Sequence, residues 1–296
     1  MDLNTIFSDV PAGARRFGVV GWPLDYSLSP AMHNAAMAFF GFNAVYRALK
    51  ISPEEWDGFA KNVALEGFNV TIPYKEKVLA LASSLKGTVS VCRAANTMVR
   101  GAEGWEAHNT DGQGLLEDLR DQKMAWEGRS VVLLGAGGAA RAALFALGTG
   151  ARLITLVNRS LERARVLAKD YADAGGKGDV RVAQSVEESL RGADLLINAT
   201  SVGLKDGDPS PVPVECLRRD LAVNDMIYHR ETVLVNAARA IGATAVGGLG
   251  MLVNQGALAF ELWFHEDLKK VKYDPQTLRK IMGDAARAAL KERTIP

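Results

Sequence analysis

A glycine-rich turn in the second half of the chain has the composition of a dinucleotide-binding site. The sequence GAGGAARA starts at Gly135, directly after the apolar run at 131–134 and before a stretch typical of a helix. Gly135 permits a tight turn, Gly137 lets the backbone approach a pyrophosphate, and the start of the following helix can bind the phosphates. A glycine-rich turn that binds nothing is the alternative, but the strand–turn–helix context favours a bound dinucleotide.

The end of the next apolar run indicates which dinucleotide would bind. An enzyme that prefers NAD usually has Asp or Glu about 20 residues after the glycines, where the carboxylate holds the ribose 2′-hydroxyl. Here the chain reads Asn158-Arg159-Ser160, and Arg163 follows. Because no carboxylate stands beside them, the two guanidinium groups can pair with a 2′-phosphate. The alternative is that both arginines are solvated residues at a helix start. We therefore predict NADP.

Polar side chains gather in three other segments, and the first of them is SLSP. Ser27 and Ser29 stand where a helix is predicted to begin, and hydroxyls and free N–H groups at a helix start bind carboxylates well. Ser29 can equally be a plain N-cap, whereas capping does not explain Ser27. A carboxylate site at this helix start is therefore the hypothesis.

The second and third segments place amide, hydroxyl and charged groups together. In GFNVTI, Asn69 and Thr71 alternate onto one face of a predicted strand, and Lys75 follows on a predicted helix. The third segment combines Asn96-Thr97 with NTDG, which contains Asp111. Taken singly, Lys75 is best explained as a surface lysine and Asp111 as the cap of the helix that follows.

The elements that must position these residues alternate between strands and helices. We predict strands at 17–20, 44–49 and 67–72, a hairpin turning at 101–104, and helices from Ser29 to before Gly41, from Ser52, and at 74–85. From Ser130 onward, continuous Val/Ile/Leu runs precede helices or turns, which is typical of a doubly wound, Rossmann-type parallel sheet. The predicted fold class is α/β, with domains at 1–111 and 112–246 and a helical segment at 247–296.

The composition excludes several classes of protein. Of the 296 residues, 35 are basic and 34 acidic, so there is no basic excess for nucleic acid or an acidic membrane surface. No apolar run reaches the roughly 20 residues of a membrane helix, and the N-terminus lacks a signal-peptide pattern. Cys92 and Cys216 fit no metal or redox spacing and the four histidines are scattered, so we expect reduced thiols, no metal and a cytoplasmic enzyme.

Taken together and in order, several segments resemble the shikimate dehydrogenase family. They are GWPLDYSLSPAMHN, GFNVTIPYKEKV, AANTMV, NTDGQG, GAGGAARA, NRS, NATSVGL and GGLGMLVNQGALAFELW, which cover the chain from about Gly18 to Trp263. A glycine fingerprint alone would be weak, but the combination of SLSP, NVTIPYK, NTDG and GMLVNQ is highly specific. The resemblance implies NADP-dependent, reversible reduction of 3-dehydroshikimate to shikimate, a step of chorismate and aromatic amino acid biosynthesis.

The resemblance also implies roles for individual residues. Lys75 and Asp111 match the catalytic pair. Positions that bind substrate are matched by Ser27, Ser29 and Tyr228 at the carboxylate and by Thr71, Asn96 and Gln255 at the ring hydroxyls. Positions that bind NADP are matched by Gly135, Gly137, Gly138 and Ala139 at the phosphate turn, by Asn158, Arg159 and Arg163 at the adenosine phosphate, and by Thr200, Met226, Gly248 and Met251 around the nicotinamide. The helices from 247 onward are expected to return to the substrate domain.

Some positions depart from the usual family pattern, and some alternatives remain. The departures are Asp25-Tyr26 where histidine is common, Arg93 where glycine is usual, Gly247 where aspartate is frequent, and His229-Arg230 where Asn-Pro is common. A quinate/shikimate dehydrogenase that accepts NAD is the nearest alternative, and Ser29 and Arg159 argue against it. A methylenetetrahydrofolate dehydrogenase would not explain SLSP and NTDG, and a catalytically inactive transcriptional sensor would be expected to lose the Lys/Asp pair or carry a DNA-binding segment. We expect a monomer or a homodimer.

Overall fold

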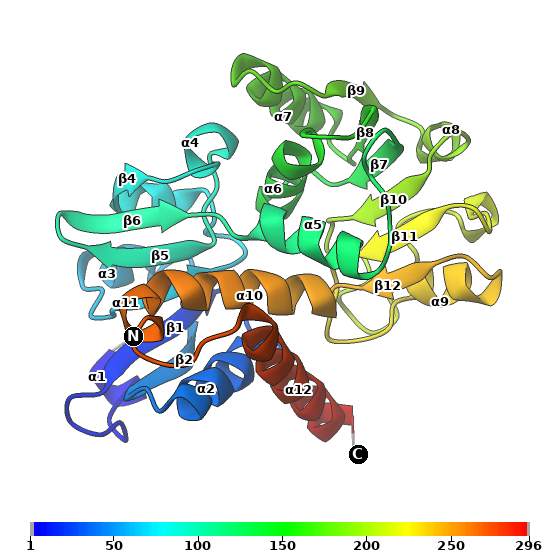
Figure 1. Ribbon diagram of the computed structural model, residues 1–296. Coiled ribbons are helices and arrows are strands. Elements are labelled where there is room, and N and C mark those ends of the chain that lie inside the picture. Colours follow the sequence, from blue (N-terminus) through cyan, green and yellow to red (C-terminus); the bar gives the residue numbers. More distant parts are fainter. Residues whose placement is uncertain (1–2, 295–296) are drawn as a thin grey trace. The chain divides into compact units, whose positions relative to one another are not determined.

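The computed structural model describes residues 3–294, which fall into two compact units (Figure 1). Unit 1 contains the chain up to Thr110 together with the chain from Val253 onward, and unit 2 is Asp111–Leu252. The sequence placed the second boundary at 246/247, before a helix. The structure places it inside helix α10 (Leu249–Trp263), because one continuous helix carries the chain from unit 2 into unit 1.

Unit 1 is built on a mixed six-stranded sheet. Its strands are β1 (Arg15–Gly21), β2 (Ala44–Lys50), β3 (Gly67–Val70), β4 (Ala82–Leu85), β5 (Thr97–Gly101) and β6 (Gly104–His108), in the order β2-β1-β3-β5-β6-β4. Strand β1 lies parallel to both β2 and β3, and β5 runs antiparallel to β3 and β6. The predicted hairpin is confirmed, because Gly101 pairs with Gly104 at the turn between β5 and β6.

The helices of unit 1 are short except for three. They are α1 (Leu3–Ile6), α2 (Ser29–Phe40), α3 (Trp56–Lys61), the 3-10 helix η1 (Lys77–Leu81), α4 (Val89–Cys92), most of α10, α11 (His265–Leu268) and α12 (Pro275–Thr294). Helix α2 has the predicted bounds, with Pro30 in its first turn and Gly41 in the left-handed conformation at φ 70°. Helix α3 begins at Trp56, later than predicted, although Glu55 Oε2 accepts a hydrogen bond from Ser52 N at 3.1 Å, which is half of the predicted capping box.

The predicted helix at 74–85 is wrong. Only residues 77–81 are helical, and residues 82–85 form β4, which pairs in parallel with β6. Lys, Leu and Ala favour a helix in isolation, but the edge of β6 offers backbone partners, and Ser83 Oγ donates to Glu103 O at 3.0 Å. Strand β3 also ends at Val70 rather than Ile72. Pairing with a distant strand has overridden local propensity here.

Unit 2 has the predicted doubly wound fold. Its strands are β7 (Ser130–Leu134), β8 (Leu153–Val157), β9 (Asp179–Ala183), β10 (Leu195–Asn198), β11 (Ala222–Asp225) and β12 (Ala245–Gly247). They form one sheet in the order β12-β11-β10-β7-β8-β9, and every neighbouring pair is parallel. Its helices are α5 (Asp111–Asp121), α6 (Gly138–Leu147), α7 (Leu161–Asp173), α8 (Val186–Leu190), the 3-10 helix η2 (Val214–Cys216) and α9 (Val233–Ala240).

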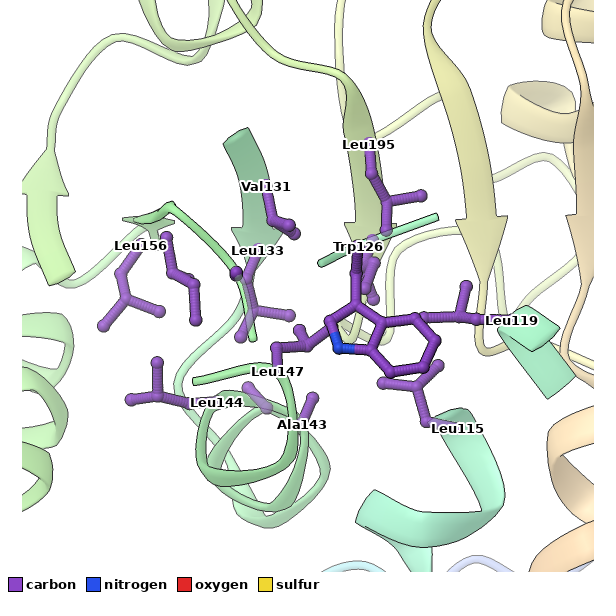
Figure 2. Close-up of a cluster of buried hydrophobic side chains, with 14 of the residues drawn as sticks. Leu115, Leu119, Trp126, Val131, Leu133, Ala143, Leu144, Leu147, Leu156 and Leu195 are labelled. Carbon is purple, nitrogen blue, oxygen red and sulfur yellow. The ribbon is translucent and has the colours of Figure 1, made fainter. Parts of the chain in front are cut away.

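Alternate residues of β7 fill two hydrophobic cores, one on each face of this sheet. Val131 and Leu133 belong to the core formed with α5, α6 and α7, and Figure 2 shows the indole of Trp126 within it. Val132 and Leu134 belong to the second core, which contains residues of α9. A strand buried on both faces explains the unbroken apolar run in the sequence. The sheet is therefore a rigid base for the loops at its carboxyl edge.

Candidate active site

The glycine-rich turn follows β7 and begins α6. Gly135 has φ 110°, and a Cβ at this position would lie 3.0 Å from Ala199 O, so only glycine suits the turn. Gly137 is the N-cap of α6, and a Cβ added there would meet nothing within 4 Å. Gly138 and Ala139 form the first turn of the helix and are half-buried. The start of α6 is therefore open on the side of Gly137, and its N–H groups suit a phosphate.

The residues after β8 present two cationic side chains. Asn158 Nδ2 donates to Ser160 O at 2.8 Å, and Ser160 Oγ caps α7 by accepting from Arg163 N. The side chains of Arg159 and Arg163 are exposed, and neither forms an ion pair within residues 3–294. Capping orders the backbone at this edge while both guanidinium groups stay available to an anion.

A buried polar network shapes the loops after β10 and β11. Asn198 Oδ1 accepts from Thr200 Oγ1 at 2.7 Å and from Thr200 N at 3.1 Å, while Asn198 Nδ2 donates to Asp225 Oδ1 at 2.9 Å. Thr232 Oγ1 donates to Asp225 Oδ2 at 2.7 Å, and Met226 N donates to Asn198 O. Burial raises the pKa of the Asp225 carboxyl. Sequence reasoning missed Asn198 and Asp225, although each is a polar residue that ends an apolar strand.

A second buried carboxylate lies at the start of α10. Asp118 of α5 is 1% exposed, accepts from Asn224 Nδ2 at 3.2 Å, and is hydrogen-bonded to the backbone of Met251. Burial raises the pKa of the Asp118 carboxyl. Gly248 leaves no room for a side chain, since a Cβ would lie 2.3 Å from Met226 O. Asp118, which helps to position Met251, was not predicted from the sequence.

The residues that depart from the family pattern after β11 hold a neighbouring loop. His229 Nε2 lies 3.0 Å from Leu204 O, and Arg230 forms an ion pair with Asp206 at 2.6 Å. Tyr228, which precedes them, is half-buried. In place of the usual Asn-Pro, these two side chains connect the loop after β11 to the loop after β10.

The helix start at Ser29 is not a plain N-cap, which was the alternative to a carboxylate site. Leu28 is the N-cap of α2 and makes no side-chain cap bond, and Ser29 is already helical. Ser27 Oγ instead accepts from Ser29 N at 3.3 Å, so Ser27 has the local role that the sequence could not explain. Both serines are buried, and within residues 3–294 the Ser29 hydroxyl has no protein partner. That hydroxyl therefore remains available at the positive end of α2.

The side chain of Asn96 connects three segments of unit 1. Its Nδ2 donates to Thr110 Oγ1 at 2.8 Å and to Gln255 Oε1 at 3.0 Å. Its Oδ1 accepts from Thr110 N at 2.8 Å and from Thr97 Oγ1 at 3.0 Å. The residue is 2% exposed. Asn96 thus binds the start of β5, the end of the segment before α5 and helix α10 together.

Lys75 lies in a turn between β3 and η1, and not on a helix as predicted. Its carbonyl accepts from Ala95 N at 2.7 Å, and its side chain is half-buried. The buried Tyr74 anchors the same turn, because its hydroxyl donates to Ile51 O at 2.6 Å. Thr71 follows β3 directly and is half-buried. The turn is therefore attached to the residue next to Asn96.

Asp111 is the first residue of α5, where the sequence suggested a cap for a helix starting one residue later. It is buried. The residue before it, Thr110, is hydrogen-bonded to Asn96. Ala95 and Asn96 thus anchor the turn that carries Lys75 on one side and the residue preceding Asp111 on the other.

Ten of the predicted residues follow or precede strands at one sheet edge in each unit. In unit 1, the segments after β1 and β3 and the start of β5 share an edge, and they carry Ser27, Ser29, Thr71, Lys75 and Asn96. In unit 2, the carboxyl ends of five parallel strands carry Gly135, Asn158, Thr200, Met226 and Gly248. Ligands of doubly wound proteins bind at this edge.

In the part of the chain that the structure describes, no group of three or more His, Cys, Asp or Glu side chains is arranged to hold a metal ion. None of the helices in that part is both long enough and apolar enough to cross a membrane.

Three family models match successive parts of the chain. Residues 19–98 match the shikimate dehydrogenase substrate binding domain, residues 118–204 match the shikimate / quinate 5-dehydrogenase family, and residues 248–268 match the shikimate 5′-dehydrogenase C-terminal domain. The matches therefore fall on both units and on α10.

Individual proteins show the same similarity over nearly the whole length. The chain is 42% identical to a shikimate dehydrogenase (NADP(+)) of Methanopyrus kandleri over 87% of this chain and 93% of that protein. The crystal structure of shikimate 5-dehydrogenase from Thermus thermophilus in complex with NADP(H) and shikimate has a TM-score of 0.80 at 36% identity, over 93% of this chain and 99% of that one. Shikimate dehydrogenase from Aquifex aeolicus has a TM-score of 0.81 at 34% identity, over 92% and 98% of the two chains.

Proposed function

The chain belongs to the shikimate dehydrogenase family, and we propose that Lys75 and Asp111 catalyse the NADP-dependent, reversible reduction of 3-dehydroshikimate to shikimate. One observation carries the residue assignment. Ala95 N holds the backbone carbonyl of Lys75, and Asn96 holds Thr110, so the backbone positions of Lys75 and Asp111 are attached to two neighbouring residues. Such an arrangement suits a reaction in which charge develops on a carbonyl oxygen.

The residues at the carboxyl edge of the unit 2 sheet fit NADP. The start of α6 is open at Gly137, and the exposed guanidinium groups of Arg159 and Arg163 would hold the 2′-phosphate. Thr200 and Met226 would lie beside the nicotinamide, where the Asn198 network orders their loops. When bound, the reduced cofactor supplies the hydride for the C3 carbonyl carbon of the substrate.

Lys75 acts on the oxygen of that carbonyl group. The ammonium group donates hydrogen bonds and carries a full positive charge, so it stabilises the alkoxide that forms as the carbon is reduced. It can also deliver the proton that the alkoxide takes up. Asp111 orients the ammonium group and accepts a hydrogen bond from the neighbouring hydroxyl of the ring, which limits the rotation of the substrate.

The remaining predicted residues orient the substrate. Ser27 and Ser29, at the positive end of α2, bind the carboxylate together with Tyr228. Thr71 and Gln255 bind ring hydroxyls. Asn96 reaches the ring only by exchanging one of its present hydrogen bonds, so we assign to it mainly the positioning of Gln255 and of the segment before Asp111.

A spectrophotometric assay tests the function directly. Purified protein is mixed with shikimate or quinate and with NADP⁺ or NAD⁺, and the reduced cofactor is followed by its ultraviolet absorbance. We expect rapid turnover only with shikimate and NADP⁺. Faster turnover with quinate and NAD⁺ would assign the chain to the quinate branch, and no turnover in any mixture would refute the proposal.

Replacing Lys75 with alanine tests the catalytic assignment. Positioned acid–base groups contribute about 10²–10⁴-fold, so we expect kcat for shikimate oxidation to fall by that factor. Lys77→Ala is the matched control, because Lys77 is exposed and pairs with Asp57 at 3.4 Å. Near-native turnover of Lys75→Ala would remove Lys75 from the mechanism.

Replacing Arg159 with alanine tests the cofactor assignment. A charge-assisted hydrogen bond contributes about 1.5–3 kcal/mol, so we expect KM for NADP⁺ to rise about 10- to 100-fold while KM for NAD⁺ stays nearly constant. Arg165→Ala, on the exposed surface of α7, is the control. An equal loss for both cofactors would contradict a contact between Arg159 and the 2′-phosphate.

We further propose that the enzyme acts in the cytoplasm. Both cysteines, Cys92 and Cys216, are free, and thiols stay reduced in that compartment. We also propose that the protein is a monomer or a homodimer. Size-exclusion chromatography with light scattering distinguishes the two.

A further inference from the structure

The last helix of the chain ends beside the first serine of the SLSP segment. Helix α12 packs along α2, and Met32 and Met282, one from each helix, both lie next to Gly256 of α10. In the last turn of α12, Arg293 Nη2 donates to the carbonyl oxygen of Ser27 at 3.0 Å. A side chain 266 positions away in the sequence therefore contacts the residue that begins the proposed carboxylate site.

Among residues 3–294, no acidic side chain forms an ion pair with the guanidinium group of Arg293, and the residue is exposed. The nearest acidic residue in sequence to Ser27 is Asp25, whose carboxylate is already paired with Lys50 at 2.5 Å. Positive potential from the guanidinium group thus adds to that of the N-terminus of α2 at Ser27 and Ser29.

We propose that Arg293 sets the affinity for an anionic substrate by placing a positive charge behind the Ser27 backbone, next to the substrate carboxylate. This inference rests on the proposed function, in which Ser27 and Ser29 bind that carboxylate. The guanidinium group holds the Ser27 carbonyl and attracts the carboxylate through space, while the two serines make the direct hydrogen bonds. Arg293 is therefore a positioning and affinity residue and has no part in the hydride or proton transfer.

The position of the charge predicts how the kinetics will change. Arg293 lies at the carboxylate end of the substrate, so it attracts the ground state and the transition state equally. Loss of such uniform binding raises KM and leaves kcat nearly unchanged. An exposed charge acting over several ångströms is screened by water, so the expected rise in KM for shikimate is about three- to tenfold.

The test uses Arg293→Met, which keeps the aliphatic part of the side chain and removes the charge. KM and kcat are measured at low ionic strength with shikimate and with shikimate methyl ester, which has the same ring but no carboxylate charge. We expect KM to rise for shikimate and to stay constant for the ester, with kcat within about twofold for both. Arg293→Lys, which keeps the charge, should restore most of the affinity for shikimate.

Arg287→Met is the matched control, because Arg287 lies on the same helix and pairs with Asp284 at 2.7 Å. It should leave both KM values unchanged, and thermal unfolding should show the same midpoint for all variants. An equal rise in KM for shikimate and the ester would show that Arg293 only holds the Ser27 backbone, and it would overturn the proposal. An unchanged KM in an active enzyme would also overturn it, whereas a wild-type protein inactive on shikimate would refute the proposed function itself.

Discussion

Replacing His33 with phenylalanine removes an imidazole that the folded protein keeps neutral. His33 is a residue of α2, and its ring is fully buried. The ring is stacked on that of Tyr46 with 4.4 Å between the centroids, and its centroid lies 5.2 Å from the ring centroid of Trp263. Burial disfavours the charged form and lowers the pKa of His33 from 6.5 to about 3. Phenylalanine can occupy the same aromatic cluster and carries no titratable group.

The effect on stability follows from the difference in proton binding. Between pH 6.5 and about pH 3 the unfolded chain binds a proton at His33 and the folded chain does not. The free energy of unfolding therefore falls by about 1.4 kcal/mol per pH unit as the pH drops through this range. When the pH falls from about 7 to about 5, protonation of His33 in the unfolded chain lowers the free energy of unfolding by about 2 kcal/mol. His33→Phe should not show this decrease.

Urea denaturation of the wild type and of His33→Phe, each at about pH 7 and about pH 5, measures how much stability each protein loses between the two pH values. Any packing cost of phenylalanine does not depend on pH, so it cancels when the change between the two pH values is compared. His265→Gln is the control, since the His265 side chain is 69% exposed, and it should lose as much stability as the wild type. If His33→Phe also loses as much as the wild type, the imidazole is not held neutral and the reasoning is wrong.

Two further predictions concern backbone positions in unit 1. A Cβ at Gly67 would lie 2.4 Å from Trp263 Nε1, which donates to Met98 O, so Gly67→Ala should lower the free energy of unfolding by about 1–3 kcal/mol in urea titrations. Gly58→Ala, where a Cβ meets nothing within 4 Å, should not destabilise. Arg93 is exposed with φ 53°, where the family usually has glycine, so Arg93→Gly should raise the thermal midpoint through a gain of about 0.5–1 kcal/mol. A lower midpoint would mean that the left-handed backbone costs Arg93 nothing.

The conformation of the glycine-rich turn and the NADP preference were predictable because they depend on neighbours in sequence. The φ of 110° at Gly135 and the open helix start at Gly137 follow from a strand, a tight turn and a helix in succession. The absence of an acid beside Arg159 is likewise visible in the sequence. The doubly wound sheet was predictable for a related reason, since strands buried on both faces must be apolar throughout.

The failures lie where a distant partner decides the local structure. Residues 82–85 look helical, but β6 provides a strand to pair with, and β4 forms instead. Lys75, predicted on the same helix, lies in a turn whose Lys75 carbonyl accepts from Ala95 N. The competing local conformations differ little in energy, so a contact with a distant segment is enough to choose between them.

The family, the fold class and the cofactor could be predicted from the sequence alone. The contacts of Asn96 with Gln255, of Asp118 with Asn224 and of Arg293 with the Ser27 carbonyl could not. Backbone conformation depends on near neighbours, whereas these hydrogen bonds require two groups from distant segments to be brought together by the packing of whole elements.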